Sequence, residues 1–483
     1  MNFGIRKEAG DTRAAHRLGR GISVAVTAML ASGVPGLAQS PPPATASAPA
    51  PLYSAGPSAA SDDTAGALPD MAGEPSADAA IAPAEEDQGR TNTREGNVDG
   101  TRASGSADRG PPGIRFGTLL LRPALSERIA TESTKTGKDT DRRTYSETEL
   151  KGTLTTDWSR HELSITGQGA WQKNISGTAE TEPTADIAAD LRLDLADETV
   201  AHLTAGYNFG RESTSDPNAI EEAAVQSGIH QYSTGASLQH DFGRLRGTVA
   251  GDLTRWNYSD ARLGDGTRIS LTDRNRTAYG LRARLGYEMS PALIPFLEVS
   301  AGRVGYDETI DRYGYARSGE NYGAKAGLSV DFGEKLRGEI GFGYKTQTHE
   351  DDRLEDLSAA TVDGNITWSP QRDTDLALGF TTGLEPSTTP GLSGTVAYGL
   401  TANLTRQLRE NLVATLSNSA TWRKYPDGET GSDNVVYETR AGLQVDINRY
   451  FALTADVGYE LTDNKNSDDT RELRAAIGIT ARR

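Results

Sequence analysis

Residues 322–344 read YGAKAGLSVDFGEKLRGEIGFGY, and the apolar or small side chains in this stretch recur at every second position. One set spans Tyr322–Phe332 and a second set spans Leu336–Tyr344, while lysine, serine and acidic residues occupy positions between them. A period of two is typical of β-strands that have one apolar and one polar face. The polar break at 333–335 therefore predicts a tight connection between two neighbouring strands.

The same alternation recurs through most of the chain beyond Ile114, where proline becomes rare. Further segments of this kind are Leu150–Trp158, Leu163–Trp171, Ile187–Leu195, Tyr279–Tyr287, Leu376–Phe380, Tyr437–Ile447 and Phe451–Leu461. So many regular strand signals predict an all-β fold.

The composition excludes several protein classes. The 483-residue chain has 53 glycines, 17 tyrosines, no cysteine and a formal net charge of -17. Without cysteine there are no disulfides, thiolate zinc sites or iron–sulfur clusters. No uncharged apolar stretch approaches the ~20 residues of a spanning helix, but a β-barrel directs only alternate residues to lipid, so a mean hydropathy of -0.54 does not exclude the membrane. The acidic excess argues against binding to nucleic acid.

The N-terminal part has a different composition from the rest. A basic stretch precedes the apolar run Ile22–Ala31, and small residues follow up to Ala38, so residues 1–38 are predicted to be a secretory signal peptide. Residues 39–113 are rich in Ala, Pro and Ser and are predicted to form a disordered periplasmic tail. Residues 114–483 form the predicted barrel domain.

The connections between the predicted strands alternate in length, which distinguishes a membrane barrel from a soluble sandwich. Short links lie at 157–160, 196–198, 241–244, 289–291, 331–335, 369–373 and 448–450. Long polar links lie at 134–143, 177–184, 211–222, 259–275, 309–319, 350–356, 426–433 and 463–469. Short periplasmic turns and long extracellular loops are typical of outer-membrane barrels. We expect a transmembrane, antiparallel, up-and-down β-barrel of about eighteen strands, or sixteen, because Leu119–Thr131 and Ala292–Arg303 alternate poorly.

Aromatic residues cluster beside both kinds of link, as expected for two belts at the membrane interfaces. The candidates are Trp158, Trp171, Tyr207, Phe242, Tyr258, Tyr279, Tyr287, Phe332, Tyr344, Trp368, Trp422 and Tyr459.

The alternate set of side chains must face the interior, and it is heavily charged. The candidates for this inner wall are Arg192, Asp194, Arg246, Asp252, Arg282, Arg284, Arg337, Glu339, Glu438, Arg440, Asp446 and Asp456. These residues could line an aqueous channel with arginines opposite carboxylates. They could equally form ion pairs across neighbouring strands that only keep the inner wall hydrated and play no part in transport.

Several short motifs carry a resemblance to a known family. They include Gly113-Ile114-Arg115-Phe116-Gly117, Asp157-Trp158-Ser159-Arg160-His161, His240-Asp241-Phe242-Gly243-Arg244 and Trp368-Ser369-Pro370. In this order, over the region from Ile114 to Arg483, the chain resembles the putative β-barrel porin-2 family of alphaproteobacterial outer-membrane proteins. The resemblance implies an outer-membrane barrel and carries no catalytic residues across.

No catalytic or metal-binding motif is apparent. The histidines beyond the predicted signal peptide lack the spacing of a metal site, and no Gly-x-Ser-x-Gly motif is present. We therefore expect a protein that is not an enzyme and that uses neither a cofactor nor a metal ion.

Three functions fit these features. The first is a passive porin-like channel for small hydrophilic solutes, in contact with outer-membrane lipid and inserted by periplasmic chaperones and the barrel assembly machinery. The second is an exit channel for a polysaccharide exporter, for which Trp256 is the clearest inward aromatic residue. The third is a structural barrel that the N-terminal tail attaches to the cell wall.

Overall fold

The computed structural model describes residues 112–483, apart from 178–180, 214, 215, 217, 221, 222, 427–432, 466 and 467. The predicted signal peptide and nearly all of the predicted tail lie outside the described residues. Within them, no helix has both the length and the apolar character that crossing a membrane requires.

The described chain is built almost entirely of long antiparallel strands. One sheet contains nineteen strands, of which β1 (Ile114–Phe116) is a three-residue hairpin arm, which leaves eighteen for the barrel wall. These are β2 (Leu119–Thr136), β3 (Asp139–Thr156), β4 (His161–Ser176), β5 (Thr184–Ala196), β6 (Thr199–Arg211), β8 (Gly228–Phe242), β9 (Leu245–Tyr258), β12 (Arg276–Tyr287), β13 (Leu293–Tyr306), β14 (Gly319–Asp331), β15 (Leu336–Gln347), β16 (Leu357–Gln371), β17 (Thr374–Pro386), β18 (Gly394–Arg409), β19 (Leu412–Lys424), β20 (Asn434–Asp446), β21 (Phe451–Asn464) and β22 (Thr470–Arg482).

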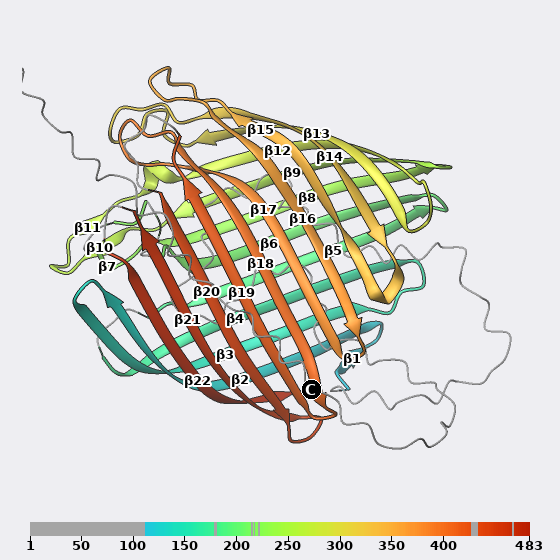
Figure 1. Cartoon of the computed structure of the whole chain (residues 1–483), viewed down its shortest axis with the longest axis horizontal. Coiled ribbons are helices and arrows are strands. Elements are labelled where there is room, and N and C mark those ends of the chain that lie inside the picture. Colours follow the sequence, from blue (N-terminus) through green and yellow to red (C-terminus); the bar gives the residue numbers. More distant parts are fainter. Residues whose placement is uncertain are drawn as a thin grey trace, which may run out of the picture. The chain divides into compact units, whose positions relative to one another are not determined.

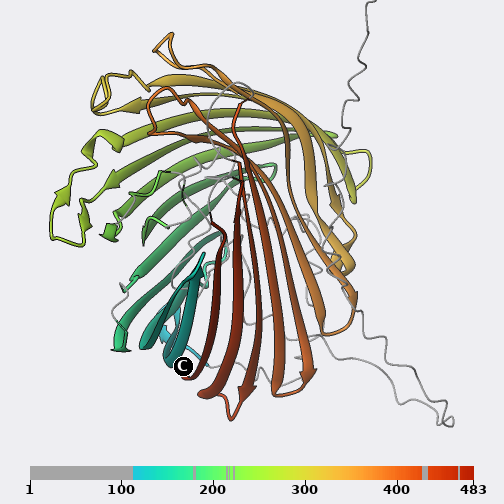
Figure 2. The same ribbon diagram turned by 60° about the vertical axis from the view of Figure 1, so that its left-hand side comes forward.

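The wall closes on itself because the first and last long strands pair. Each strand is hydrogen-bonded to the next in sequence, and β2 pairs with β22 from Ala124 opposite Arg482 to Thr136 opposite Thr470. Figure 2 shows the strands curving around one interior. The predicted all-β antiparallel barrel is confirmed, with eighteen strands and not sixteen, because the poorly alternating stretches form β2 and β13.

Side chains alternate between the two faces of the wall. On β12, Tyr279, Leu281 and Leu285 are exposed on the outer surface, whereas Arg282 between them is buried. Outward apolar residues are what a lipid environment requires, and inward charged residues must be paired or hydrated. This division accounts for a chain that is hydrophilic on average.

The two ends of the barrel differ. In Figure 1, β1 and the C-terminus lie at one end, which we call the short-turn rim, and β7, β10 and β11 lie at the other, the long-loop rim. At the long-loop rim, one expected link was wrong and one loop was missed. The link at 134–143 is a two-residue turn between β2 and β3, at which Gly137 has a positive φ of 58°. A loop at 387–393 between β17 and β18 was not predicted.

Small elements occupy the connections. At the long-loop rim, β7 (Ala223–Val225), β10 (Ala261–Leu263) and β11 (Arg268–Ile269) form a three-stranded sheet beside the 3-10 turn η2 (Thr272–Arg274). At the short-turn rim, η3 (Gly333–Lys335) joins β14 to β15. The loops at the long-loop rim are therefore folded structures in their own right.

Candidate functional site

The inner wall at the seam between β22, β2 and β3 carries a buried ion network. Arg128 of β2 donates to Glu147 of β3 at 2.7 Å and to Glu149 at 3.2 Å. Arg474 of β22 reaches across β2 to the same Glu147 at 3.2 Å, and only 1% of Arg474 is exposed. Charged side chains that are buried this deeply are stable only when they form ion pairs. The network therefore links three strands at the point where the barrel closes.

Next to this network, Arg143 and Arg474 stack on Tyr145. Their guanidinium carbons lie 4.4 Å and 5.7 Å from the centroid of its ring. Arg143 also donates two hydrogen bonds to Glu132, at 2.8 Å and 2.9 Å. A flat guanidinium group can combine stacking with a forked bond to a carboxylate, which holds the aromatic ring against the wall.

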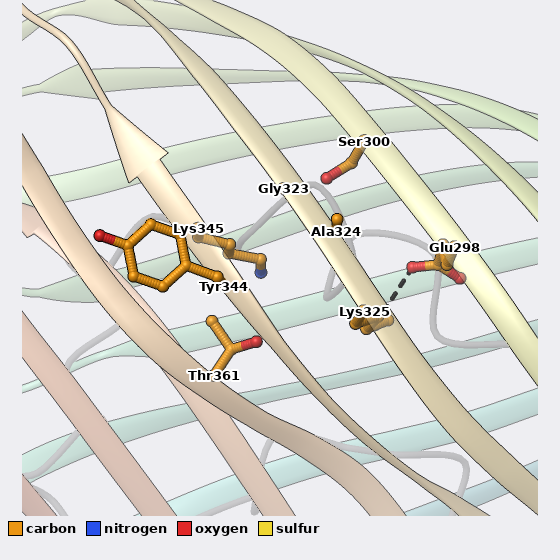
Figure 3. Close-up of a pocket in the computed structure, with 8 residues that line it drawn as sticks. All are labelled: Glu298, Ser300, Gly323, Ala324, Lys325, Tyr344, Lys345 and Thr361. Atoms are coloured by element: carbon orange, nitrogen blue, oxygen red, sulfur yellow. Dashed lines mark ion pairs between the residues drawn. The ribbon is translucent and has the colours of Figure 1, made fainter.

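A second charged group lies on β12 to β15. Arg284 donates to Glu298 and, at 2.8 Å, to Glu339. Lys325 also contacts Glu298, at 3.2 Å. Figure 3 shows this ion pair beside a small hollow, with Lys345 on the neighbouring strand.

Glycine shapes that hollow. Gly323 faces Ser300, and a Cβ at this position would come within 2.7 Å of the Ser300 hydroxyl oxygen. Gly343 packs equally closely against the backbone of its neighbour Ala324. Both glycines therefore lie where a larger residue would clash with the neighbouring strand, so the strands can approach each other closely here.

The structure places the twelve predicted inner-wall residues at inward positions of their strands and pairs many of them. Arg192 contacts Asp194 at 3.0 Å, and Glu438 lies 3.5 Å from Arg440. Further contacts of this set are Arg246–Asp241, Arg284–Glu339, Asp446–Arg482 and Asp456–Arg128. Asp252 and Arg282 are at least partly buried, whereas Arg337 is exposed near the short-turn rim.

Sequence reasoning missed several inward charges. They are Arg128, Glu147, Lys325, Glu460, Glu472 and Arg474. The period of two would have found most of them, because they alternate with outward residues such as Ile129 and Leu473. In some strands consecutive apolar residues, as at Leu119–Leu121, obscure the alternation. In others the apolar face gives the stronger signal, and the charged face was not considered.

Three carboxylates stand side by side on the inner wall of β20, β21 and β22. Glu438 is paired in register with Glu460, and Glu460 with Glu472. Like charges directly opposite each other on adjacent strands destabilise a sheet. This arrangement, which we call the carboxylate row, concentrates three carboxyl groups in one sector of the wall.

Loops from opposite sides of the barrel meet at the long-loop rim. The side chain of Asn218, between β6 and β8, donates to the carbonyl of Pro386 at 3.0 Å and accepts from the backbone N–H of Thr388 at 2.8 Å. Between these two loops lie eight strands on one side of the wall, β8 through β17, and ten on the other. The contact, which we call the loop bridge, therefore crosses the mouth almost along a diameter.

Two buried arginines hold the loop bridge in place. Arg317, between β13 and β14, donates to the carbonyls of Ser387, Thr389 and Leu392 and forms a 2.7 Å ion pair with Asp311. Arg274 of η2 pairs with the buried Glu212 at 2.9 Å and donates to the carbonyl of Asn218 at 2.8 Å. Each arginine therefore ties neighbouring loops together through charge-assisted hydrogen bonds to their backbone carbonyls.

Comparison with known proteins assigns the family. A family sequence profile described as Putative beta-barrel porin 2 matches residues 107–483, more than half of the chain. The chain belongs to the putative β-barrel porin 2 family. Membership confirms the resemblance noted in the sequence, and it makes this porin-family barrel an outer-membrane protein of a Gram-negative bacterium.

Several solved structures have a similar architecture at low sequence identity, and one of them, OpdK, is described as an outer membrane protein. OpdK and OpdO of Pseudomonas aeruginosa are 9% and 11% identical, with a TM-score of 0.39 each, and cover 75% of this chain and 99% and 97% of their own. OccAB4 of Acinetobacter baumannii is 11% identical, with a TM-score of 0.36 and coverage of 75% and 98%. A search of curated proteins finds no match.

Most of the predicted belt residues of this porin-family barrel are exposed on its outer surface. They are Trp158, Trp171, Phe242, Tyr279, Tyr287, Phe332, Tyr344, Trp368, Trp422 and Tyr459. Tyr207 is half-buried against Tyr232 and His230. Tyr258 differs, since it faces inward, is 8% exposed and accepts a hydrogen bond from Arg276 at 3.1 Å. The strand end where Tyr258 lies is covered by loops, so the ring packs into protein and not into lipid.

Trp256 is also covered. It is fully buried in a small core with Tyr258, Ala261 and Leu271, and the Arg276 guanidinium carbon lies 4.6 Å from its ring. A sugar-binding platform must expose the face of its ring. The clearest inward aromatic residue therefore has a structural role, and the polysaccharide-exit alternative is not favoured.

Proposed function

We propose that this porin-family barrel is a passive channel that lets small hydrophilic solutes cross the outer membrane. The observation that carries the proposal is the closed eighteen-strand wall whose inner face is lined by charged residues and whose outer face is apolar. A barrel of this size encloses an aqueous path. The ion pairs along this inner face orient water and favour hydrated solutes over apolar ones.

Single-channel recording tests the proposal directly. The full chain, refolded into a planar bilayer, should give discrete and stable conductance steps in potassium chloride. Liposomes that contain the barrel should also swell in small sugars. A barrel that is correctly folded but gives neither steps nor swelling would overturn the proposal.

We expect the ion preference to depend on the ion pairs around Arg284. Replacing Glu339 with glutamine should lower the cation-to-anion permeability ratio roughly twofold, because it leaves the positive charge of Arg284 with less compensation in a confined path. The ratio is read from the reversal potential in a salt gradient. Glu334→Gln at the exposed η3 turn serves as the control and should change nothing. Anion preference in the unaltered protein would mean that the arginines prevail.

Acidic pH should loosen the long-loop rim through His349. Burial lowers the pKa of this imidazole, and the nearby Arg317 guanidinium lowers it further. Below the unfolded-state pKa of about 6.5, the unfolded loop binds a proton that the folded loop does not, so loop stability falls as pH falls through that value. We expect current fluctuations to increase between pH 7 and pH 5. His349→Gln should abolish this dependence, and an unchanged dependence would contradict the assignment.

For the N-terminal part, we infer a cleaved signal peptide and a periplasmic tail from the sequence. Residues 1–38 would be removed as a signal peptide, and the following tail would lie in the periplasm with the short-turn rim, on the side from which the barrel assembly machinery inserts barrels. N-terminal sequencing of the protein from outer membranes should begin at Gln39. A mature chain that retains the basic N-terminal stretch would refute the signal peptide.

A further inference from the structure

The outer surface of β2 contains an acidic residue among apolar ones. Glu127 is exposed, and its outward neighbours Leu125 and Ile129 are 50% and 56% exposed. On the paired strand β22, the exposed Ile479 lies directly opposite Glu127. Glu127 is the one acidic side chain that the described strands place on the outward face between the two aromatic belts. An acidic side chain on the lipid-facing surface is unfavourable unless something else covers it.

The strand pairing places Glu127 at mid-depth. We call a row of residues that pair across neighbouring strands a rung. The rung of Glu127 begins at Leu453 of β21, two residues from Phe451 near the short-turn rim. It ends at Trp171 of β4, near the long-loop rim. Such rungs climb across the wall because the strands of a barrel are tilted. Glu127 lies between these two ends and is therefore far from both interfaces.

Among the described residues, one polar partner of Glu127 is found. The hydroxyl of Thr148 on β3 donates to Glu127 Oε2 at 2.6 Å. A carboxylate can accept about four hydrogen bonds. The group therefore has acceptor capacity on the side that faces away from the barrel.

A complementary group lies elsewhere on the outer surface. Asn418 of β19 is an outward side chain whose Oδ1 accepts a hydrogen bond from the hydroxyl of Thr439 on β20 at 3.0 Å. The remaining capacity of this amide is its Nδ2 donor group. A carboxylate that needs donors and an amide that offers them thus lie on different sectors of the same wall.

The two groups lie at about the same depth. The rung of Asn418 contains Thr439 and Tyr459, and the rung of Glu127 contains Leu453. Tyr459 and Leu453 are six residues apart on β21, which corresponds to about 20 Å along the strand. From β19 to β2 there are four strand spacings, about 19 Å. For a strand tilt near 45°, these two offsets cancel in height.

From this complementarity we propose that the outer faces of β2–β3 and β19–β20 form an interface between copies of this chain, with Glu127 of one copy accepting from Asn418 of the next. The two faces are about a quarter of the circumference apart. A head-to-tail contact that repeats about an axis along the membrane normal then closes a small ring of about three or four copies. This inference concerns assembly and does not depend on conduction.

Cysteine cross-linking tests the contact, because the natural chain has no cysteine. Within one chain the two positions are four strand spacings apart, well beyond the ~7 Å that a disulfide spans between Cα atoms. Any disulfide in the Glu127→Cys, Asn418→Cys double variant therefore joins two copies. Oxidation with copper–phenanthroline in outer-membrane vesicles should give a ladder that ends at three or four copies and collapses under reductant.

The single cysteine variants give the matched controls, and each should stay monomeric on a non-reducing gel. A covalent dimer of either single variant would mean that a face contacts its own copy, which would overturn the proposed head-to-tail contact. Double-variant barrels that resist protease yet remain monomeric would overturn the interface altogether.

Native mass spectrometry of the detergent-solubilised protein gives a second readout. Glu127→Leu should shift the population from ring to monomer by about tenfold or more, and Thr234→Val on the far wall should leave it unchanged. A monomeric unaltered protein, or a Glu127→Leu ring as abundant as the original, would count against the proposal.

Discussion

Arg317→Ala is expected to open the long-loop mouth and to raise the single-channel conductance several-fold. The guanidinium is buried and holds the carbonyls of Ser387, Thr389 and Leu392 while it pairs with Asp311. Removing one member of a buried pair leaves the other uncompensated and costs about 3–5 kcal/mol. That is enough to release the loop bridge without unfolding the strands. Recordings in planar bilayers measure the effect.

Two further variants isolate the loop bridge as the cause. Arg303→Ala removes an exposed ion pair with Glu350 at the same rim and should leave conductance unchanged, because exposed pairs contribute about 0–1 kcal/mol. A disulfide between Asn218→Cys and Thr388→Cys should hold the bridge closed until reductant is added. Equal conductance of the Arg317→Ala barrel and the original, with both barrels folded, would show that the bridge does not limit flow.

Glu147→Gln is expected to lower the free energy of unfolding by about 3–5 kcal/mol. This carboxylate is nearly fully buried and faces both Arg128 and Arg474, so its neutralisation leaves two guanidinium groups with much less compensation. Since these residues lie on β2, β3 and β22, the loss falls on the closing seam. The urea midpoint of the barrel refolded into lipid vesicles reports the change.

A nearby lysine provides the control for this experiment. Lys151 pairs with Glu149 at 2.7 Å, but about a third of its side chain is exposed. Lys151→Met should therefore shift the midpoint far less. A Glu147→Gln barrel within about 1 kcal/mol of the original would mean that hydration, and not ion pairing, stabilises the seam charges.

Much of the architecture follows from the sequence by itself. A period of two is a local property, since adjacent side chains in an extended strand point to opposite faces whatever the strand's partner. For that reason the alternation at 322–344 and elsewhere predicted the strands, the inward positions of residues such as Arg284 and most of the outward aromatic residues, and the alternating link lengths then predicted a barrel. The short motifs likewise indicated the family.

The tertiary structure decided which of these residues meet. Strand register and barrel closure bring Arg474 to Glu147, more than 300 residues away, and carry Asn218 across the mouth to Thr388. The loops that cover Tyr258 and Trp256 turned an expected belt residue and an expected sugar platform into core residues. Alternation depends only on the chain's own geometry, whereas ion pairs and loop contacts depend on the stagger between strands and on the fold of the loops. No local pattern in the sequence contains that information.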